Sequence, residues 1–525
     1  MSKNNPTYFP LLLGLFTSVA FLIGVYNNQG NKYSVNSKIE QIINLIDKNY
    51  VDSVDKTNLV EQSINGLLKN LDPHSVYIPA KETQLANESL QGHFGGIGIR
   101  FMILRDTLMV TDVINGGPSK LAGLLSGDRI IKVNNDSITD VGITNQAVFK
   151  LLKGKIGSTV NVTTYSTISK KKTNHTINRG MIPLPSVDAA FMLTAEIGYI
   201  KLSSFSDKTP IEFRAAVKEL SSIGAKNLIL DLRNNSGGYL HGAISVSDEF
   251  LVANKLIVYT EGLHQKRQNH YATKSGSFEN GGVVVLINSG SASASEIVAG
   301  AIQDNDRGTI VGRRSFGKGL VQQPIKLGDN SELRLTISRY YSPTGRCIQK
   351  PYGDGENYNN ELLERYESGQ MYSPDTSLFS DQKKFITPKG KIVFGGGGIS
   401  PDVFVSLDSS EFSSYYSSIY YSSAVRDFCF DNFEKINASN FSKIEEFSRD
   451  FKVSKKMLDQ FTSYAEENNQ IPISEKLSSI TIDRIKKQLK REFSSYFFDQ
   501  ESRYFLSTKD DDDITMAIKV LENKN

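Results

Sequence analysis

The residues best suited to chemistry are serines at an expected strand-to-helix junction. Residues 291–296 read Ser-Ala-Ser-Ala-Ser-Glu, after an apolar run, Val283 to Ile287, and before a helix-like run, Ile297 to Ile302. A serine hydroxyl becomes an effective nucleophile where a sharp turn exposes it and the following N–H groups face the substrate carbonyl oxygen. Ser293 is therefore the candidate nucleophile, although serine and alanine also begin ordinary helices.

A serine nucleophile needs a base. The chain has six histidines, and only His241, just after Gly237-Gly238, stays open as a candidate. A lysine that burial keeps neutral can act instead, and Lys318 lies 25 residues after Ser293 between two glycines. Lowering a lysine pKa from about 10.4 to about 7.5 costs on the order of 4 kcal/mol, so the site must exclude water. The apolar residues available to wall it off are Phe316, Leu320 and Val321.

The same glycines also suggest a phosphate-binding loop. Residues 312–318 fit the pattern G-x-x-x-x-G-K, with Thr309 to Val311 as the preceding strand. However, Gly319 stands where a hydroxyl is needed to ligate Mg²⁺, and Arg313 and Arg314 fill positions that usually hold small residues. Nucleotide binding is therefore the weaker interpretation.

A third segment offers hydrogen-bond donors. Leu228 to Arg233 is a largely apolar run typical of a buried parallel strand, and it leads into Asn-Asn-Ser-Gly237-Gly238. Paired glycines let the backbone approach a ligand closely, although they also make plain strand-to-helix turns. An N–H group of Gly237 or Gly238, with that of Ala294, could form an oxyanion hole.

Together these segments resemble the C-terminal processing peptidases, also called tail-specific proteases. The similarity covers roughly residues 37–405 and rests on ordered motifs at Leu71 to Tyr77, Phe94 to Ile99, Gly116 to Ile130, Asp231 to Gly238, Ser291 to Glu296, Gln303-Asp304, Phe316 to Gln323 and Tyr340 to Arg346. The resemblance implies a multidomain α/β protein. It would have a crotonase-like (ClpP-like) peptidase core, an inserted PDZ-like β-rich domain and a helical N-terminal region.

The resemblance also assigns the catalytic residues. They are Ser293 as nucleophile, Lys318 as general base, Gln322 to orient the lysine, and Asp304 to support the site. No metal ion or organic cofactor is needed for this chemistry.

Some of these assignments have alternatives. Ser291 or Ser295 would be the nucleophile only if the alignment were shifted by two residues. Asp304 could simply end a helix. Glu296 is better interpreted as complementing the dipole of the helix than as an acid catalyst.

Residues 93–180 are expected to form a peptide-binding module. Short alternating runs broken by glycine, proline and asparagine predict a small β-rich domain. Gly96-Ile97-Gly98-Ile99 resembles the carboxylate-binding loop of PDZ domains, although a glycine-containing strand would read the same way. Ile97 and Ile99, with Val148 and Leu152 on an expected helix over 145–153, predict an apolar pocket. Substrates should therefore end in an apolar residue.

The remaining segments complete the expected organisation. Residues 8–26 contain no charge and could span a bilayer, so residues 1–32 are expected to be a membrane anchor or signal segment. Lys3 before this run suggests that the catalytic region is extracytoplasmic, as in a bacterial periplasm. The other expected parts are a helical domain over 33–92, the Ser/Lys peptidase core over 181–408, and a mainly helical tail of unknown role over 409–525.

Three further features concern the tail and the composition. The acidic run at residues 510–513 suggests a cation site or, more simply, the first turn of a helix. A net charge of +3, spread along 525 residues, gives no reason to expect nucleic acid as a partner. Two cysteines far apart in sequence either pair or stay free.

The function expected from the sequence is a membrane-tethered serine endopeptidase. It would recognise substrate C-termini through the PDZ-like domain and could form a homo-oligomer through its N-terminal helices. The main alternative is a non-catalytic peptide-binding scaffold on an inactive protease core. Retention of Ser293, Lys318 and Gln322 argues against a scaffold, because a scaffold needs none of them.

Overall fold

The computed structural model describes residues 13–20, 35–166, 169–274, 276–353, 358, 360–373, 383–408, 413–436, 441–473 and 476–523. Its contacts divide the chain into two compact units. One contains the residues up to Lys81 with Pro324–Leu335, and the other contains Glu82–Gln323 with Thr336–Asn525. Cys347 and Cys429 are both free thiols.

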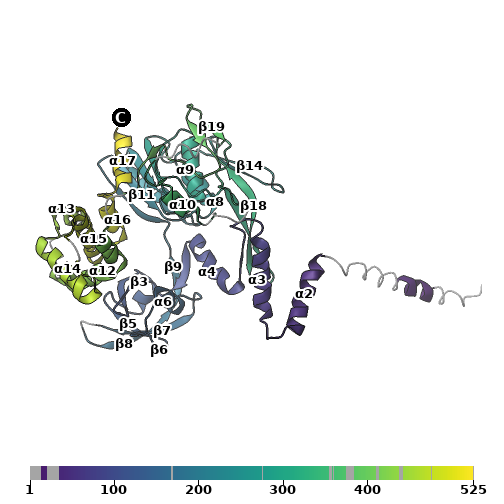
Figure 1. Ribbon diagram of the computed structural model, residues 1–525, viewed down its shortest axis with the longest axis horizontal. Coiled ribbons are helices and arrows are strands. Elements are labelled where there is room, and N and C mark those ends of the chain that lie inside the picture. The colour runs from purple at the N-terminus through teal and green to yellow at the C-terminus, as the bar shows by residue number, and fades with distance from the viewer. Residues whose placement is uncertain are drawn as a thin grey trace, which may run out of the picture. The chain divides into compact units, whose positions relative to one another are not determined.

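The centre of the second unit is a six-stranded sheet (Figure 1). Its order is β10 (Val187–Met192), β11 (Ile197–Leu202), β12 (Asn227–Asp231), β15 (Gly282–Ile287), β16 (Thr309–Gly312) and β21 (Val403–Phe404). β10 is antiparallel to β11, and the other neighbours are parallel. Every residue of β11, β12 and β16 is buried, as expected of strands that are covered on both faces. The two strands predicted from apolar runs, β12 and β15, are confirmed.

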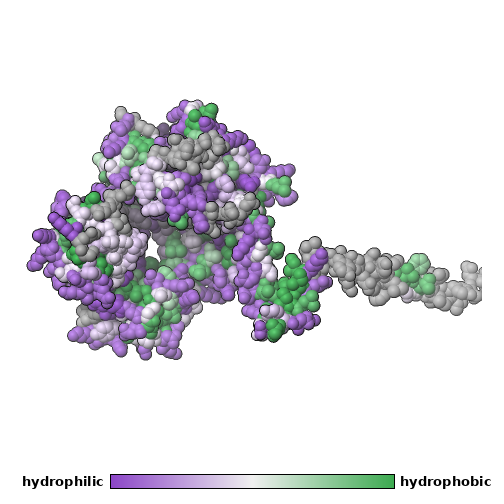
Figure 2. All heavy atoms as spheres, in the orientation of Figure 1, coloured by the Kyte–Doolittle hydropathy of each residue, from purple (hydrophilic) through white to green (hydrophobic). Residues whose placement is uncertain are grey.

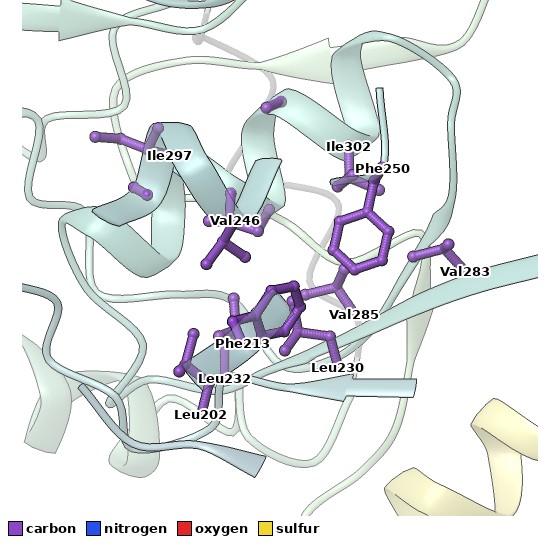
Figure 3. Close-up of a cluster of buried hydrophobic side chains, with 14 of the residues drawn as sticks. Leu202, Phe213, Leu230, Leu232, Val246, Phe250, Val283, Val285, Ile297 and Ile302 are labelled. Carbon is purple, nitrogen blue, oxygen red and sulfur yellow. The ribbon is translucent and has the colours of Figure 1, made fainter. Parts of the chain in front are cut away.

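Three helices cover one face of this sheet. They are α7 (Thr209–Ser222), α8 (Leu240–Asp248) and α9 (Ala294–Asp304). Because side chains alternate along a strand, Leu230 and Val285 point to this face, where they meet Phe213, Val246 and Phe250 (Figure 3). This core fixes α9, and hence the serine turn that precedes it.

The other face of the sheet is covered by the last helix of the chain, α17 (Asp512–Glu522). Ile514, Ala517 and Leu521 pack against Val284 and Leu286 of β15, and the cluster also includes Val311 of β16. The acidic run at 510–513 therefore leads into the first turn of a helix, as the simpler interpretation predicted. The end of the C-terminal tail is thus part of the peptidase core.

Other strands of the chain pair in an antiparallel manner. They include β13 (Leu256–Glu261), β14 (Gln268–Tyr271), β17 (Leu320–Lys326), β18 (Glu332–Tyr341) and β1 (Val76–Ile78). In the second unit, the end of β18 pairs with β13, with Tyr259 opposite Tyr341. In the first unit, the start of β18 pairs with β1, with Val76 opposite Arg334. A short helix, α10 (Glu361–Glu367), and a hairpin of β19 (Lys384–Ile386) and β20 (Ile392–Phe394) follow.

The N-terminal part of the described chain is helical. It contains α2 (Val35–Asn49) and α3 (Lys56–Leu68), and α4 (Ala80–Gln91) follows β1. Ile39, Ile42 and Leu45 of α2 are exposed and form an apolar surface (Figure 2). Residues 13–20 are also helical. The rest of the predicted membrane segment, residues 8–12 and 21–26, lies outside the described residues. None of the described helices has both the length and the apolar character to cross a bilayer.

Residues 93–183 form a small β-rich module. β2 (His93–Gly96) pairs with β9 (Gly180–Pro183), and the main sheet has the order β3 (Ile99–Leu104), β4 (Thr107–Val113), β5 (Arg129–Val133), β7 (Thr159–Tyr165) and β8 (Lys172–Asn178), with β6 (Asp136–Ser137) on β5. Two helices complete it, α5 (Pro118–Leu121) and α6 (Asn145–Leu152). β3 is an edge strand of this sheet, because β4 is its only neighbour among the described strands.

The tail before α17 is an array of helices with its own core. The helices are α11 (Ser414–Tyr421), α12 (Ala424–Asn432), α13 (Ile444–Asp450), α14 (Lys455–Asn469), α15 (Ser479–Phe497) and α16 (Gln500–Thr508). Their buried aromatic residues include Phe428, Phe447, Phe461 and Phe493. Ile485, Leu489 and Phe493 are all buried on α15, so this helix is amphipathic.

Candidate active site

Ser293 occupies the sharp turn between β15 and α9. Its backbone has φ 55° and ψ −112°, a conformation that residues with a side chain rarely adopt. Within residues 291–300 it is the one residue that is not buried. Ser291 and Ser295 are fully buried, and their hydroxyls donate to the carbonyl oxygens of Leu232 and Asn235, both at 2.8 Å. Of the three serines, only Ser293 can therefore present its hydroxyl to a ligand.

Lys318 lies in the loop that connects β16 to β17. This loop is fastened to the serine turn by a hydrogen bond of 2.9 Å from Phe316 N to Ser291 O. A strand follows Lys318 rather than a helix, so the loop lacks the helix N-terminus that a phosphate-binding loop uses. Arg314, in the same loop, donates to Gly397 O at 2.9 Å. The nucleotide-binding alternative is thus not supported by the geometry.

Glu296 joins the serine turn to the lysine loop. Its Oε2 accepts hydrogen bonds from Ser293 N at 2.8 Å and Lys318 N at 2.9 Å. Its Oε1 accepts from Ser315 Oγ and Gly317 N, both at 2.6 Å. The side chain is buried, and burial raises the pKa of Glu296 to about 7 even though these four donors favour its ionised form. One carboxylate therefore holds both backbone segments.

Tyr340 of β18 connects the same two residues from another side. Its hydroxyl lies 3.1 Å from Ser293 O and 2.6 Å from Lys318 O, so its hydrogen is shared between the two carbonyl groups. Burial, with a smaller contribution from Glu296, raises the pKa of Tyr340, and the hydroxyl stays a donor. Glu296 thus bridges the two N–H groups of Ser293 and Lys318, and Tyr340 bridges their two C=O groups.

The paired glycines after β12 lie against the serine turn. Gly237 has φ +102°, and a Cβ there would meet Ala292 O and Ser293 Cβ at 2.8 Å and Ala294 N at 3.0 Å. Gly238 has φ +148°, and a Cβ there would lie 2.0 Å from Phe205 O. Glycine is therefore required at both positions. Gly237 N donates to Asn235 Oδ1 at 2.9 Å. Within the described residues no hydrogen bond is formed by the N–H groups of Gly238 and Ala294.

Asp304 is not at the site, contrary to the supporting role that the resemblance implied. It ends α9, whose first residue follows Ser293, so about 15 Å of helix separates the two positions. Its carboxylate accepts from Arg346 Nη2 and Thr344 Oγ1, both at 2.7 Å, and Arg346 is 1% exposed. Asp304 therefore forms a buried ion pair at the far end of the helix, as its helix-ending alternative suggested.

Two other candidates have partners of their own. Gln322 lies on β17 and donates from Nε2 to Thr336 Oγ1 at 3.1 Å, while its predicted contact with Lys318 stays a prediction. His241 lies at the start of α8, half exposed, with Nε2 at 3.4 Å from Asp207 Oδ1. Its ring stacks on Tyr239 at 5.2 Å between ring centres. No group of His, Cys, Asp and Glu in the described part of the chain could hold a metal ion.

The predicted peptide-binding loop connects β2 to β3. Gly96 ends β2, Gly98 has φ +76°, and Ile99 begins β3. Ile97 is 2% exposed, so it belongs to the core of the module. Ile97 O and Gly98 O accept bonds from Ser119 N and Ile114 N at 2.9 and 3.1 Å. The loop is therefore held firmly beside the free edge of β3.

The apolar pocket expected from Ile97, Ile99, Val148 and Leu152 is not open as predicted. Ile97, Val148 and Leu152 are buried in the core of the module, and Ile99 packs against them. The partly exposed apolar residues of β3 and α6 include Phe101 and Phe149, whose ring centres lie 5.5 Å apart in an edge-to-face contact. The sequence correctly placed Val148 and Leu152 on one apolar face of α6, but this face packs in the core of the module and does not line an open pocket.

The sequence reasoning missed the central position of Glu296 and Tyr340. Glu296 stands three residues after Ser293, which is the spacing of a capping box, so its bond to Ser293 N could have been expected. Its bonds to residues 315–318 could not, because they connect segments about 20 residues apart in sequence. Tyr340 begins one of the sequence motifs, but nothing local in that motif indicates that its hydroxyl reaches the site from another sheet.

Four family models match the chain. They are Peptidase family S41 over residues 196–355, PDZ domain over 95–177, Activating protease CtpB N-terminal domain over 24–83, and a family of unknown function over 415–499. The carboxy-terminal-processing protease of Bartonella bacilliformis is 38% identical over 345 residues, which cover 64% of this chain and 78% of that protein. Carboxy-terminal processing protease CtpB of Bacillus subtilis is 34% identical over 316 residues, 60% of this chain and 65% of that protein.

Similar solved structures include the photosystem II D1 C-terminal processing protease. It is 24% identical, covers 70% of this chain and 92% of that chain, and has a TM-score of 0.35. The S41 core with its PDZ domain defines a serine-type peptidase. The chain belongs to the C-terminal processing peptidase family, which confirms the resemblance seen in its sequence motifs.

Proposed function

We propose that the protein is an endopeptidase in which Ser293 and Lys318 form a catalytic dyad. The observation that carries this proposal is the double bridge between them: Glu296 Oε2 accepts both N–H groups, and the Tyr340 hydroxyl lies beside both carbonyl groups. Proton transfer within a dyad requires a fixed separation, and two bridges between the backbones provide one.

The reaction would proceed through an acyl-enzyme. Ser293 Oγ attacks the peptide carbonyl carbon while neutral Lys318 accepts the hydroxyl proton. The lysine then gives this proton to the leaving amine as the C–N bond breaks, which leaves an ester on Ser293. Water, deprotonated by the same lysine, attacks the ester, the bond from the acyl carbon to Ser293 Oγ breaks, and the lysine returns the proton to Ser293 Oγ as the acid is released. Gln322 would orient the lysine, as the family resemblance implies.

The oxyanion of the tetrahedral intermediate needs N–H donors that are not otherwise engaged. Gly237 N already donates to Asn235 Oδ1, which favours Gly238 over Gly237. We therefore assign this role to the N–H groups of Gly238 and Ala294. Ala294 follows Ser293 in the chain, and Gly237, the neighbour of Gly238, lies against the same turn, since a Cβ on Gly237 would approach Ala294 N to 3.0 Å.

Substrate C-termini would dock on the PDZ domain. The free edge of β3 can accept an added peptide strand, and the loop over Gly96 to Ile99 offers N–H groups for a terminal carboxylate. Contact with Phe101 and Phe149 would favour an apolar terminal residue. We further propose that residues 8–26 anchor the enzyme to a membrane with its catalytic region extracytoplasmic, on the basis of their uncharged sequence.

Replacement of the nucleophile tests the proposed function. Ser293→Ala should lower cleavage of an unstructured protein with an apolar C-terminus by at least about 10³-fold, because the attacking oxygen is lost. A serine-reactive phosphonate should label wild type at position 293. The matched control is Ser289→Ala, a serine in the same connection that should leave cleavage intact. Equal persistence of the substrate with wild type and Ser293→Ala would instead favour the scaffold alternative.

A further inference from the structure

Asp513 is a buried carboxylate that binds two arginines at once. It is 3% exposed, in the first turn of α17. It accepts from Arg233 Nη1 at 2.8 Å, and from Arg313 Nη1 and Nη2 at 3.0 and 2.8 Å. α17 lies outside all four ranges that match known families. The proposed mechanism gives this helix no role.

The two arginines begin the two loops that complete the proposed site. Arg233 follows β12 and stands five residues before Gly238, and Arg313 follows β16 and stands five residues before Lys318. The sheet order β12–β15–β16 places the Ser293 turn, which follows β15, between them. Asp513 therefore bridges across the end of β15. Through the two arginines it links the loop that carries Gly238 to the loop that carries Lys318.

Both loops transmit this anchoring to Ser293 through hydrogen bonds. After Arg233, Asn235 O accepts from Ala292 N at 3.0 Å, next to the nucleophile. After Arg313, Phe316 N donates to Ser291 O at 2.9 Å, on the other side of the turn. A shift of Arg233 or Arg313 would thus move a loop that is hydrogen-bonded to the Ser293 turn.

The charges around Asp513 are balanced, and no other carboxylate of this cluster pairs with Arg313. The cluster contains three cations and three carboxylates, namely Lys201, Arg233, Arg313, Asp231, Asp511 and Asp513. Of the three carboxylates, Asp513 is the one paired with Arg313. Five of the six also line a cavity of about 420 Å³, so a guanidinium that lost its partner would have room to move. Loss of Asp513 would leave Arg313 its bond from Nη1 to Val405 O at 2.9 Å but remove both bonds to a carboxylate, so we expect the guanidinium to shift.

We propose that Asp513 is a positioning residue for the proteolytic reaction, which holds the oxyanion loop and the lysine loop in register through Arg233 and Arg313. The inference rests on the proposed Ser293/Lys318 mechanism and adds the last helix of the chain to it. A positioning role affects the chemical step, whereas a role in folding alone affects the amount of folded enzyme.

The test compares Asp513→Asn with Asp512→Asn in the full chain. Asp512 is exposed in the same helical turn, so its replacement removes the same charge without touching either arginine. Asp513→Asn should lower kcat about 10- to 100-fold, the loss expected of a misplacement of about 1 Å, with KM for an apolar-tailed protein within about threefold. Phosphonate labelling of Ser293 should slow in parallel. Asp512→Asn should stay within about twofold of wild type, and Asp513→Glu should recover part of the loss.

Arg313→Lys provides a second variant if Asp513→Asn does not fold. Lysine keeps the charge but cannot donate two parallel bonds to Asp513, so kcat should again fall while the melting temperature stays near that of wild type. Folded Asp513→Asn or Arg313→Lys enzyme with wild-type kcat would overturn the inference. A wild-type enzyme that neither cleaves nor reacts with the phosphonate would refute the proposed function instead.

Discussion

At the scale of single residues, the position of the Ser293 backbone depends on one buried carboxylate, that of Glu296. Glu296 accepts the N–H groups of Ser293, Gly317 and Lys318, and it lies in a buried site. The sequence predicted only that it complements the dipole of α9. The structure adds that the side chain connects the Ser293 turn to the Lys318 loop.

The raised pKa of Glu296 predicts a pH-dependent stability. Because burial lifts its pKa from 4.5 to about 7, the folded state binds an extra proton between these values. The stabilisation from this proton is complete below about pH 4.5 and is lost as pH rises to about 7. Glu296→Gln removes this contribution. Chemical denaturation at pH 5 and pH 8 should therefore show a loss on the order of 2 kcal/mol in wild type that is absent from the variant.

The same substitution should impair catalysis above pH 7. An amide nitrogen would face two N–H donors where wild type has a carboxylate oxygen, so the serine turn or the lysine loop must shift. We expect kcat to fall at least about tenfold at pH 8. If wild type and Glu296→Gln show the same change in unfolding free energy with pH, and the same kcat, then Glu296 does not position the Ser293 turn or the Lys318 loop.

At the scale of elements, the site is assembled where three neighbouring parallel strands end. β12 leads to the glycine pair, β15 to Ser293, and β16 to Lys318. Ligand sites commonly lie at the carboxyl ends of such strands. The close approach of Gly237 to the serine turn follows from this arrangement and leaves no space for a side chain.

Gly237→Ala should therefore disable the enzyme by displacing the nucleophile. A Cβ at this position would lie 2.8 Å from Ser293 Cβ. The matched control is Gly224→Ala, where φ is +108° and the nearest atom is 3.7 Å away, so backbone strain is similar but no residue of the site is pushed. We expect kcat to fall about 10²-fold or more only for Gly237→Ala, with circular dichroism confirming that both variants fold. Equal losses would attribute the effect to strain alone.

At the scale of the whole molecule, peptide recognition and cleavage are expected to be carried by different domains. The PDZ domain offers an edge strand, whereas Ser293 and Lys318 lie in the S41 core. A substrate that is long enough to use both should gain from docking, and a small ester should not.

Shortening the docking loop tests this division. Deletion of Gly98 removes one N–H group from the expected carboxylate site and should raise KM for apolar-tailed proteins about tenfold. Hydrolysis of a small ester should change by less than about twofold, because the core is untouched. The measurement is a pair of steady-state titrations, with a melting curve to check the module. Equal effects on both substrates would refute a docking role.

The sequence by itself determined the family and the central strands, and it indicated Ser293 as the candidate nucleophile. Apolar runs at Leu228 to Leu232 and Val283 to Ile287 require burial on both faces, and ordered motifs fix which residues follow them. These signals are local in sequence, so they can be recognised without knowing how the chain packs. The assignment of Ser293 also needed only the turn that precedes α9.

Only the tertiary structure decided which distant groups meet. Asp304 stands in a motif but lies at the far end of α9 in an ion pair with Arg346, and the expected pocket residues Val148 and Leu152 face the core of their module. Conversely, Asp513 lies 200 residues from Arg313 in sequence and binds it directly. Hydrogen bonds and ion pairs between remote segments depend on how sheets and helices pack, and no periodicity within a segment encodes them.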